Sequence, residues 1–371
     1  MKPTFKHPHL PLGNLCPPDR SIILCARSSK RRSPSGRTGS ALLLTSLLVM
    51  PAVALSKPDK CTVSSNVATC SGNQSEGIRN SVDFGTNTPV LMVKDLSADI
   101  GPALSNTASV AAILLEYATG DNLENMALSF IESNYKILSD TGNSAGIKLQ
   151  STTKNGSGGK GGGLFAAGGT GHGGTTGRTL SVTVDTGDAG NSNAGINTTG
   201  ASSPGILIDS TAGSGGGGGS SDCCNGGSGG GGGNGSPVNV KGTGSVRANG
   251  SDSVGINIKN KGGNGGSGHD SGAGGHGGSG GSGGTGGQVQ LDSSQAWSIS
   301  SGKGSDNAAV QVQAFGGHGG TAHAGATNGG HGGRGGNGGE IQIGSQTQGA
   351  WTLNTVGSSA HGFSLLSQAG N

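Results

Sequence analysis

A short sequence phrase returns five times in the second half of this chain, and long runs of glycine separate its copies. Each copy consists of a small polar turn, a small residue, in most copies a glycine, an apolar residue and a short alternating strand. The apolar residues of successive copies are 59, 50, 54 and 53 residues apart. Repeats with periods in this range are typical of stacked architectures, in which each repeat packs only against its neighbours. The five apolar anchors are Ile147, Ile206, Ile256, Val310 and Phe363.

The composition excludes one thick globular core. Of 371 residues, 81 are glycine, 30% are hydrophobic and 3% are aromatic, whereas an ordinary globular domain is about 45–50% apolar. Such a chain is either disordered, because it cannot offset the entropy of ordering, or a thin solenoid whose coils bury small aliphatic side chains. The alternating strands favour the solenoid outside the glycine runs. Within the runs, disorder and a polyproline-II-like form are both open.

The repeats over residues 143–371 predict an all-β fold, a parallel β-solenoid. After each phrase come a glycine run, a second strand, a turn and a third strand that leads into the next copy. Without its glycine run, each unit is about as long as one solenoid coil. The runs are therefore expected as insertions at one corner of each repeat. They cover residues 155–178, 213–236, 261–287 and 316–339.

The alternating strands also predict an internal ladder of the five anchors. In each phrase the apolar residues lie two apart, so they point to the same side of a strand. Because successive coils stack at about 4.8 Å, we expect the anchors to lie one above another. The glycine before the anchor, as at Gly205, suits either a backbone with positive φ or a close approach of two backbones. The fourth copy has Ala309 at this position, which weakens the case for a positive φ.

Residues 57–142 contain little glycine and a stronger apolar alternation. We expect them to form the N-terminal cap and the first coils of the solenoid. The last of their three apolar stretches also fits a short helix, because its apolar residues lie near one helical face as well. The three stretches that favour strands are 90–100, 110–118 and 127–138.

The N-terminal segment, residues 1–56, is predicted to be an extension followed by a secretory signal peptide. A basic stretch precedes the apolar residues 41–55, and Ala52 and Ala54 form an A-x-A cleavage site. The apolar stretch is shorter than the roughly 20 residues of a membrane-spanning helix, and an N-terminal membrane anchor is the alternative. This segment holds eight of the 23 basic residues, so the positive net charge does not indicate nucleic-acid binding.

The predicted mature chain contains four cysteines in two pairs. Cys61 and Cys70 bracket two short alternating runs around a Ser-Ser-Asn turn, and a hairpin in an oxidising compartment would join them in a disulfide. Otherwise they are two small buried side chains. Cys223 and Cys224 are adjacent in the middle of a glycine run. They form a vicinal disulfide, pair between chains or stay free, and the sequence does not distinguish these states.

The signal, the stretch CTVSSNVATCSGNQSEGI and the repeated TxGxxxxGI coils broken by GGxGG runs resemble the passenger regions of bacterial autotransporters. The resemblance covers roughly residues 40–371. It implies a right-handed parallel β-helix that is exported through the inner membrane of a Gram-negative bacterium and carried to the cell surface by a C-terminal outer-membrane β-barrel. No barrel-type strands with aromatic girdles follow the repeats, so we expect a truncated passenger. The implied partners are the export machinery, that barrel, and host or cell-surface ligands.

The sequence predicts no catalytic, cofactor-binding or metal-binding residues. GxGxxG patterns arise here from the abundance of glycine, and none opens a helix after a strand. The glycine runs contain too few carboxylates for calcium-binding repeats. Their six histidines favour solvated positions over a shared metal, because no coordination spacing recurs. Trp297 and Trp351 begin equivalent strands and favour packing between coils over an exposed patch. The six histidines are His172, His269, His276, His318, His323 and His331.

The sequence as a whole favours a non-catalytic exported surface protein, an adhesin-like autotransporter passenger fragment that makes contacts spread over its repeats. The alternative is a glycine-rich structural protein of a matrix or wall, whose runs bundle as polyglycine-II-like helices. An enzyme carried on a β-helix would need Asp, Arg and Lys clustered on one solenoid face, and the sequence contains no such cluster. Neither a cofactor nor a nucleic-acid partner is predicted.

Overall fold

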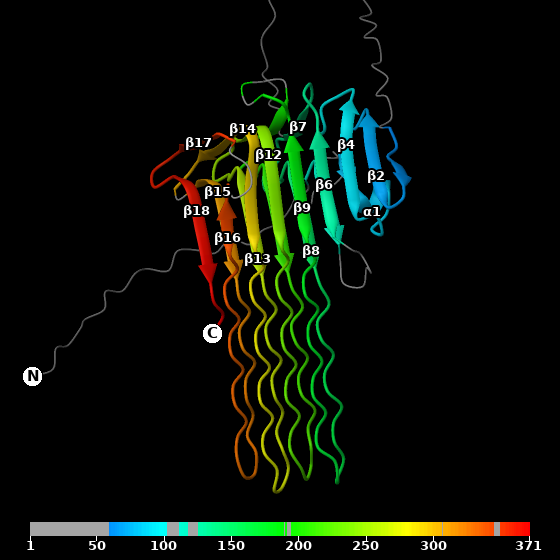
Figure 1. Ribbon diagram of the computed structural model, residues 1–371, viewed down its shortest axis with the longest axis vertical. Coiled ribbons are helices and arrows are strands. Elements are labelled where there is room, and N and C mark those ends of the chain that lie inside the picture. Colours follow the sequence, from blue (N-terminus) through cyan, green and yellow to red (C-terminus); the bar gives the residue numbers. More distant parts are fainter. Residues whose placement is uncertain are drawn as a thin grey trace, which may run out of the picture. The chain divides into compact units, whose positions relative to one another are not determined.

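The computed structural model describes residues 59–101, 111–117, 125–188, 190, 194–305, 307–344 and 349–371. The predicted signal peptide, with its cleavage site at Ala52 and Ala54, lies outside the described residues. The regular structure of the described part consists of β-strands and one short helix, α1 (Asn80–Asp83). Figure 1 shows the strands side by side, with the glycine runs extending beyond one end of them.

Two sheets contain the strands of the described residues, one with eleven strands and one with seven. Every strand pair is parallel, except β1 with β2. Neighbouring strands in each sheet come from successive repeats, which is compatible with a β-solenoid and confirms the prediction of an all-β, mainly parallel fold. The larger sheet contains β1 (Thr62–Ser64), β2 (Val67–Gly72), β4 (Val90–Leu96), β6 (Met126–Ile131), β7 (Lys136–Ser139), β9 (Leu180–Asp185), β10 (Gly195–Thr198), β12 (Val238–Ala248), β14 (Val289–Lys303), β16 (Ile341–Ile343) and β17 (Trp351–Val356). The smaller sheet contains β3 (Ile78–Arg79), β5 (Ile113–Tyr117), β8 (Ile147–Thr152), β11 (Ile206–Thr211), β13 (Ile256–Lys261), β15 (Ala308–Phe315) and β18 (His361–Gln368).

The anchors of the repeated phrase lie directly opposite one another in the seven-stranded sheet. Ile206 of β11 pairs with Ile147 on one side and with Ile256 on the other, and all three side chains are completely buried. The same column continues through Val310 to Phe363. Apolar side chains in register along the stack therefore form one continuous ladder, in which each repeat covers the apolar face of the next.

Two members of this column were missing from the sequence analysis. Ile113 of β5 pairs with Ile147, and Ile78 of β3 pairs with Ile113, and both are completely buried. Neither residue is followed by a glycine run, so the repeated phrase does not indicate that they belong with the five anchors. The ladder thus extends into the segment that the sequence assigned to the cap and first coils.

The eleven-stranded sheet supplies the opposite wall of the core. Its inward residues form parallel columns, for example Ile137, Ile196, Val246 and Ile299 on β7, β10, β12 and β14. All four are at most 1% exposed. Trp297 is completely buried beside Trp351, with ring centroids 5.0 Å apart. The tryptophans therefore pack between repeats, as the size of the ring favours.

The polar turn before each anchor is built on a column of buried serines. The backbone N–H of Ser144 donates to the hydroxyl of Ser203 at 3.2 Å, and the N–H of Ser203 donates to the hydroxyl of Ser253 at 2.9 Å. Asn143 and Ser202, the residues just before two of these serines, have positive φ values of 59° and 52°. The small polar residues of the repeated phrase thus allow a tight left-handed turn and satisfy its buried backbone donors.

Close backbone approach, and not a positive φ, explains the glycine that precedes the anchor. Gly205 does not have a left-handed backbone. A Cβ atom built on it would collide with the Val246 side chain and would lie 2.7 Å from the carbonyl oxygen of Gly255. The glycine is required because the neighbouring repeat leaves no room for a side chain.

The stretch 127–138 is neither one strand nor a helix. Strand β6 ends at Ile131 and β7 begins at Lys136. Glu132 organises the turn between them, since its carboxylate accepts hydrogen bonds from the backbone N–H groups of the next two residues, both at 2.9 Å. Periodicity did not identify this turn because it contains no glycine or proline.

The prediction of a turn between the second and third strands of a repeat is also wrong for two repeats. Strand β12 runs without a break over residues 238–248, and β14 runs over residues 289–303. Their pairing shifts register between Gly242 and Gly244. An irregularity inside a long strand takes the place of a turn, because an unpaired residue can bend a strand without ending it.

Truncation of one anchor tests the ladder. We expect Ile206→Ala to lower the free energy of unfolding by about 2–5 kcal/mol, because it leaves a cavity in a closed column. Leu207→Ala is the matched control, since Leu207 is the next residue on the same strand and is only partly buried. Chemical denaturation of both variants measures the difference. Equal destabilisation by the two substitutions would contradict the assignment of Ile206 to the core.

Candidate functional site

The four glycine runs lie between β8 and β9, β11 and β12, β13 and β14, and β15 and β16. Each run descends, reverses and returns, so that its two arms form an antiparallel pair, which we call a glycine hairpin. In the second hairpin, Gly230 and Gly233 of the returning arm donate backbone hydrogen bonds to the carbonyl oxygens of Gly216 and Gly213, both at 2.8 Å. Figure 1 shows the four hairpins next to one another in the order of the repeats.

Hydrogen bonds between the hairpins follow a period of three residues. Gly216 donates to the carbonyl oxygen of His172, on the returning arm of the first hairpin, at 2.8 Å. Gly215 donates to Asn264, on the descending arm of the third hairpin, also at 2.8 Å. Gly217, the next residue, is exposed, whereas Gly216 is buried. Three residues per turn is the period of polyproline-II and polyglycine-II helices. The hairpins thus form a two-layered bundle of such helices.

The same period explains which positions must be glycine. A Cβ atom on Gly216 would collide with the carbonyl oxygen of Ser157, and one on Gly215 would collide with that of Gly230. On Gly217, the nearest atom to a Cβ would be the carbonyl oxygen of Ser267, 3.7 Å away. Two of every three positions therefore face a neighbouring backbone, and the third faces outward. Of the two states that the sequence left open for the runs, the structure has the ordered one.

Outward positions carry polar side chains in rows across the hairpins. Asn155 and Ser214 are neighbours in one such row, on the descending arms of the first and second hairpins. The side-chain oxygen of Asn155 accepts a hydrogen bond from the N–H of Ser214 at 2.8 Å. The amide oxygen of Asn264 accepts one from the N–H of His318 at 3.0 Å in the same row. These side chains bind the backbone of the next hairpin, so the bundle has a polar surface along its length.

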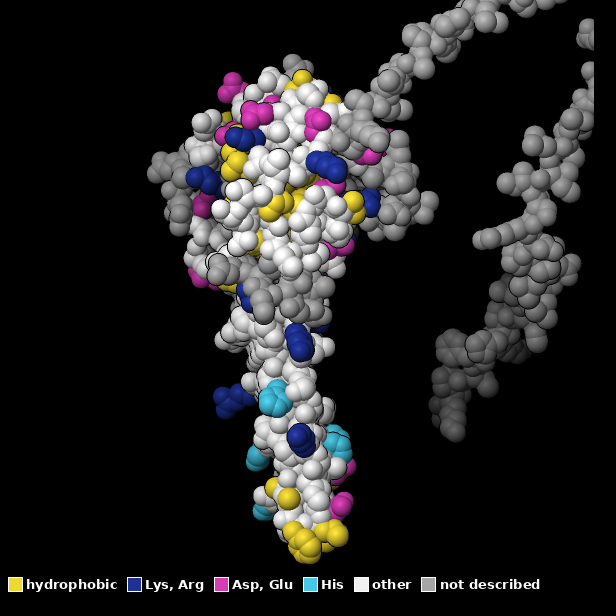
Figure 2. All heavy atoms as spheres, turned by 90° about the vertical axis from the view of Figure 1, so that its right-hand side faces the viewer, with side chains coloured by type: hydrophobic (Ala, Val, Ile, Leu, Met, Phe, Trp, Pro, Cys, Tyr) yellow, Lys and Arg dark blue, Asp and Glu magenta, His cyan; other side chains and the backbone are white. Residues whose placement is uncertain are grey.

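The reversals of the hairpins differ from their arms, because apolar side chains occupy them. Leu164 and Phe165 lie at the reversal of the first hairpin and are 69% and 95% exposed. Cys223 and Cys224 lie at the reversal of the second and are joined in a vicinal disulfide. Among the three states that the sequence allowed for these cysteines, the structure has the intramolecular bond. Figure 2 shows the hydrophobic side chains gathered at the end of the bundle.

Two of the histidines meet near the reversals of the third and fourth hairpins. The rings of His269 and His323 stack with their centroids 5.8 Å apart. The Nδ1 atom of His323 lies 3.2 Å from a carboxylate oxygen of Asp270. Within the described ranges, no group of three or more His, Cys, Asp or Glu side chains is placed to hold a metal ion.

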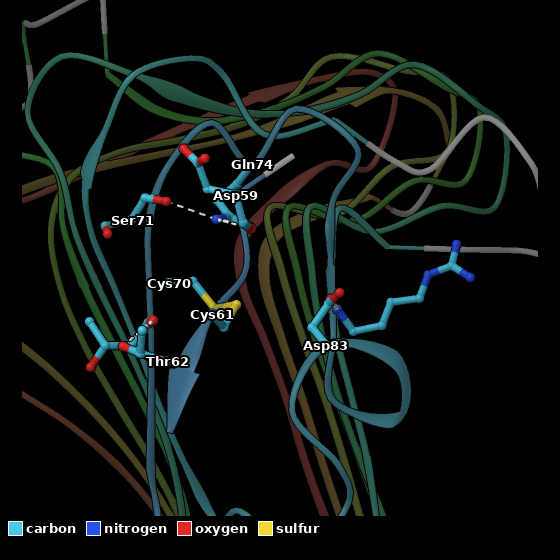
Figure 3. The surroundings of a disulfide bond; sticks show 9 residues. Asp59, Cys61, Thr62, Cys70, Ser71, Gln74 and Asp83 are labelled. Atoms are coloured by element: carbon cyan, nitrogen blue, oxygen red, sulfur yellow. Dashed lines mark hydrogen bonds between the residues drawn. A yellow bond between two sulfur atoms is a disulfide. The ribbon is translucent and has the colours of Figure 1, made fainter. Parts of the chain in front are cut away.

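Cys61 lies directly before β1 and Cys70 lies in β2, the strand pair that ends the larger sheet. Strand β1 pairs antiparallel with β2 there, and the two cysteines form a disulfide with Cα atoms 4.3 Å apart. Figure 3 shows Asp59 and Gln74 beside this bond. The amide nitrogen of Gln74 donates to the backbone oxygen of Asp59 at 2.9 Å. The disulfide therefore ties together the turn and the segment that cover this end of the sheet.

A depression of about 320 Å³ lies on the outer face of the larger sheet. It is lined by residues of β9, β12 and β14, among them Ser181, Lys241 and Asp292. Its lining comes from flat strand surfaces and holds one ammonium and one carboxylate group.

The exposed apolar residues at the reversals are candidate contact residues that the sequence did not indicate. In the sequence, Leu164 and Phe165 only interrupt the first glycine run. The structure adds that the run folds back at these residues, which puts them at the end of the hairpin. In the part of the chain that the structure describes, no helix is long and apolar enough to span a bilayer. No protein-family model, curated protein or solved structure matches the chain.

Two adjacent glycines test the bundle. We expect Gly216→Ala to destabilise the protein by about 1–3 kcal/mol, because its methyl group collides with a fixed backbone. Gly217→Ala should be neutral or stabilising by up to about 1 kcal/mol, since it restricts the unfolded chain without a collision. Denaturation and amide hydrogen exchange of residues 213–236 measure both effects. Equal tolerance of the two substitutions would show that the runs are not packed in this way.

Proposed function

We propose that this chain is a non-catalytic, exported, adhesin-like surface protein, part of an autotransporter-type passenger. On this proposal the repeats form a right-handed parallel β-solenoid, and the glycine runs are insertions at one corner of each coil. The observation that carries the proposal is the placement of the exposed apolar residues Leu164 and Phe165 at the end of a polar bundle. Such a patch on a soluble surface is typical of a contact site.

The bundle supports this role because it holds the contact residues away from the sheets. Polyproline-II-type helices extend by roughly 3.1 Å per residue, about twice the rise of an α-helix. Hydrogen bonds within a hairpin, as from Gly230 to Gly216, and between hairpins, as from Gly216 to His172, make this extended segment stiffer than a free glycine linker. The arms thus serve as a stalk, and the reversals serve as the contact surface. The export machinery, an outer-membrane β-barrel and host or cell-surface ligands are the proposed partners.

The polyglycine-II hydrogen bonding also favours the structural alternative, a matrix protein whose bundles associate between chains. The first hairpin argues against lateral growth at its outer edge. Lys154, Ser157 and Lys160 occupy the register positions that hold Gly213, Gly216 and Gly219 in the second hairpin, and all three are exposed. Their side chains fill the space that the arm of another hairpin would need. We therefore place contact at the reversals and not along the arms.

Processing of the N-terminus tests export. The full chain, produced in a Gram-negative host, is expected outside the cytoplasm with Leu55 as its first residue, because signal peptidase recognises small residues at Ala52 and Ala54. An Ala52→Asp/Ala54→Asp variant should accumulate uncleaved. N-terminal sequencing of the exported protein measures both. A chain that keeps residues 1–54 and stays with the inner membrane would favour the anchor interpretation and exclude cleavage.

Attachment of coated beads tests contact through the reversals. Beads that carry the exported protein should adhere to cultured cells, and Leu164→Ser/Phe165→Ser should reduce adhesion at least about tenfold, because two large apolar side chains leave the contact. Val82→Ser is the control, since Val82 is 74% exposed on α1 in a different part of the fold. Adhesion that is absent, or that ignores the double substitution, would refute the proposed role.

A further inference from the structure

The apolar residues of the glycine runs gather near the reversals of the hairpins. In the first hairpin they are four consecutive residues, in the second the disulfide, and in the third and fourth they are alanines. None lies on the upper parts of the arms, which carry Ser, Thr, Asn, His, Lys and Arg at their outward positions. The members of this apolar tip are Leu164, Phe165, Ala166, Ala167, Cys223, Cys224, Ala273, Ala322, Ala324 and Ala326.

Hydrogen bonds between reversals hold the tip together. The hydroxyl of Ser221 donates to the carbonyl oxygen of Ala166 at 2.8 Å and accepts from the backbone N–H of Cys224 at 3.0 Å. The N–H of Gly272 then donates to the carbonyl oxygen of Ser221 at 2.6 Å. The side chain of Phe165 is 95% exposed despite this ordered backbone. Leu164 and Phe165 therefore project from the tip. A projecting pair of side chains can insert into a partner, whereas it cannot form a pocket that surrounds one.

The first hairpin is also the most basic of the four. Between residues 155 and 178 it contains Lys160 and Arg178 and no acidic residue, and Lys154 stands at its start. The acids of the other hairpins are Asp222, which directly precedes Cys223 at the second reversal, and Asp270, which is paired with His323 near the third. Lys160 precedes Leu164 by four residues, which is about 12 Å along an arm of this type. The ammonium group of Lys160 thus lies on the same arm as the apolar projection, on the side nearer the sheets.

We propose that the tip of the first hairpin inserts into the interface of a membrane that contains anionic lipid. Leu164 and Phe165 enter the boundary between headgroups and acyl chains, a layer that interfacial segments penetrate by about 5–10 Å. Lys160 then reaches the anionic headgroups, and Lys154 adds a weaker, screened attraction. This inference rests on the proposed function, because it names the partner of the same tip.

A lipid surface fits these observations better than a protein receptor. Shape-selective recognition of a protein requires polar groups at fixed positions around the apolar anchor. Ala166 and Ala167, the residues that follow the projection, are exposed and carry no such groups. A soft apolar layer below a negative surface matches a hairpin end that combines two apolar side chains with one cation, Lys160, behind them.

Vesicle flotation tests the inference. The full chain should bind vesicles of phosphatidylcholine with phosphatidylserine more tightly than vesicles of phosphatidylcholine alone, and high salt should reduce the difference. Leu164→Ser/Phe165→Ser should weaken binding at least about tenfold. Val82→Ser should leave binding unchanged, although it removes a comparable exposed apolar side chain. Equal binding by the double variant and the parent chain would overturn the inference.

A local probe separates the tip from the basic residues 1–54, which all variants share. Phe165→Trp should give a blue-shifted emission with anionic vesicles and should be quenched by lipids brominated on their acyl chains. Val82→Trp should show neither change. A Phe165→Trp spectrum that stays the same when the protein binds would overturn insertion. If beads still adhere to cells through the tip while neither vesicle result appears, the proposed function stands and the partner is a protein or glycan instead of lipid.

Discussion

Parallel pairing of successive repeats, with their apolar residues in register, is the interaction on which the rest of the structure depends. A slip of one residue would turn Ile206 and its neighbours from the core to the outside of the sheet. The same register aligns the glycine hairpins. Ile147 and Ile206 are 59 residues apart, and so are Asn155 and Ser214, which meet in the bundle. The sheets therefore determine which glycine faces which carbonyl oxygen in the bundle.

The two regions are stabilised by different interactions. Between the sheets, buried aliphatic columns such as those of Ile206 and Val246 remove apolar surface from water. The bundle has no apolar interior, and its arms are joined by backbone hydrogen bonds whose net contribution is about 0.5–1.5 kcal/mol each. Ordering glycine costs more entropy than ordering any other residue. The bundle is therefore expected to depend on the sheets, which bring its arms together before their hydrogen bonds can form.

This division of labour connects the fold to the proposed role. The sheets set the register of the repeats. The arms of the hairpins keep that register and need glycine at two positions in three, because neighbouring backbones lie close. The reversals have no such close neighbours, so they do not need glycine. Gly216 has to be glycine because a carbonyl oxygen lies against it, whereas Phe165 has no packing partner that dictates its type and is nearly fully exposed. Residues at the reversals are thus free to be chosen for contact, and apolar side chains occupy them.

The sequence by itself determined the all-β class, the repeat and the anchors, because a two-residue alternation and a recurring phrase are local patterns. It also identified the hairpin that brings Cys61 and Cys70 together. Only the tertiary structure decided the state of the glycine runs. A glycine-rich segment has no side-chain pattern that distinguishes disorder from a packed helix, and its order comes from carbonyl oxygens that neighbouring repeats supply. For the same reason the sequence could not show that Leu164 and Phe165 lie at the end of a hairpin, since that follows from the folding back of each run.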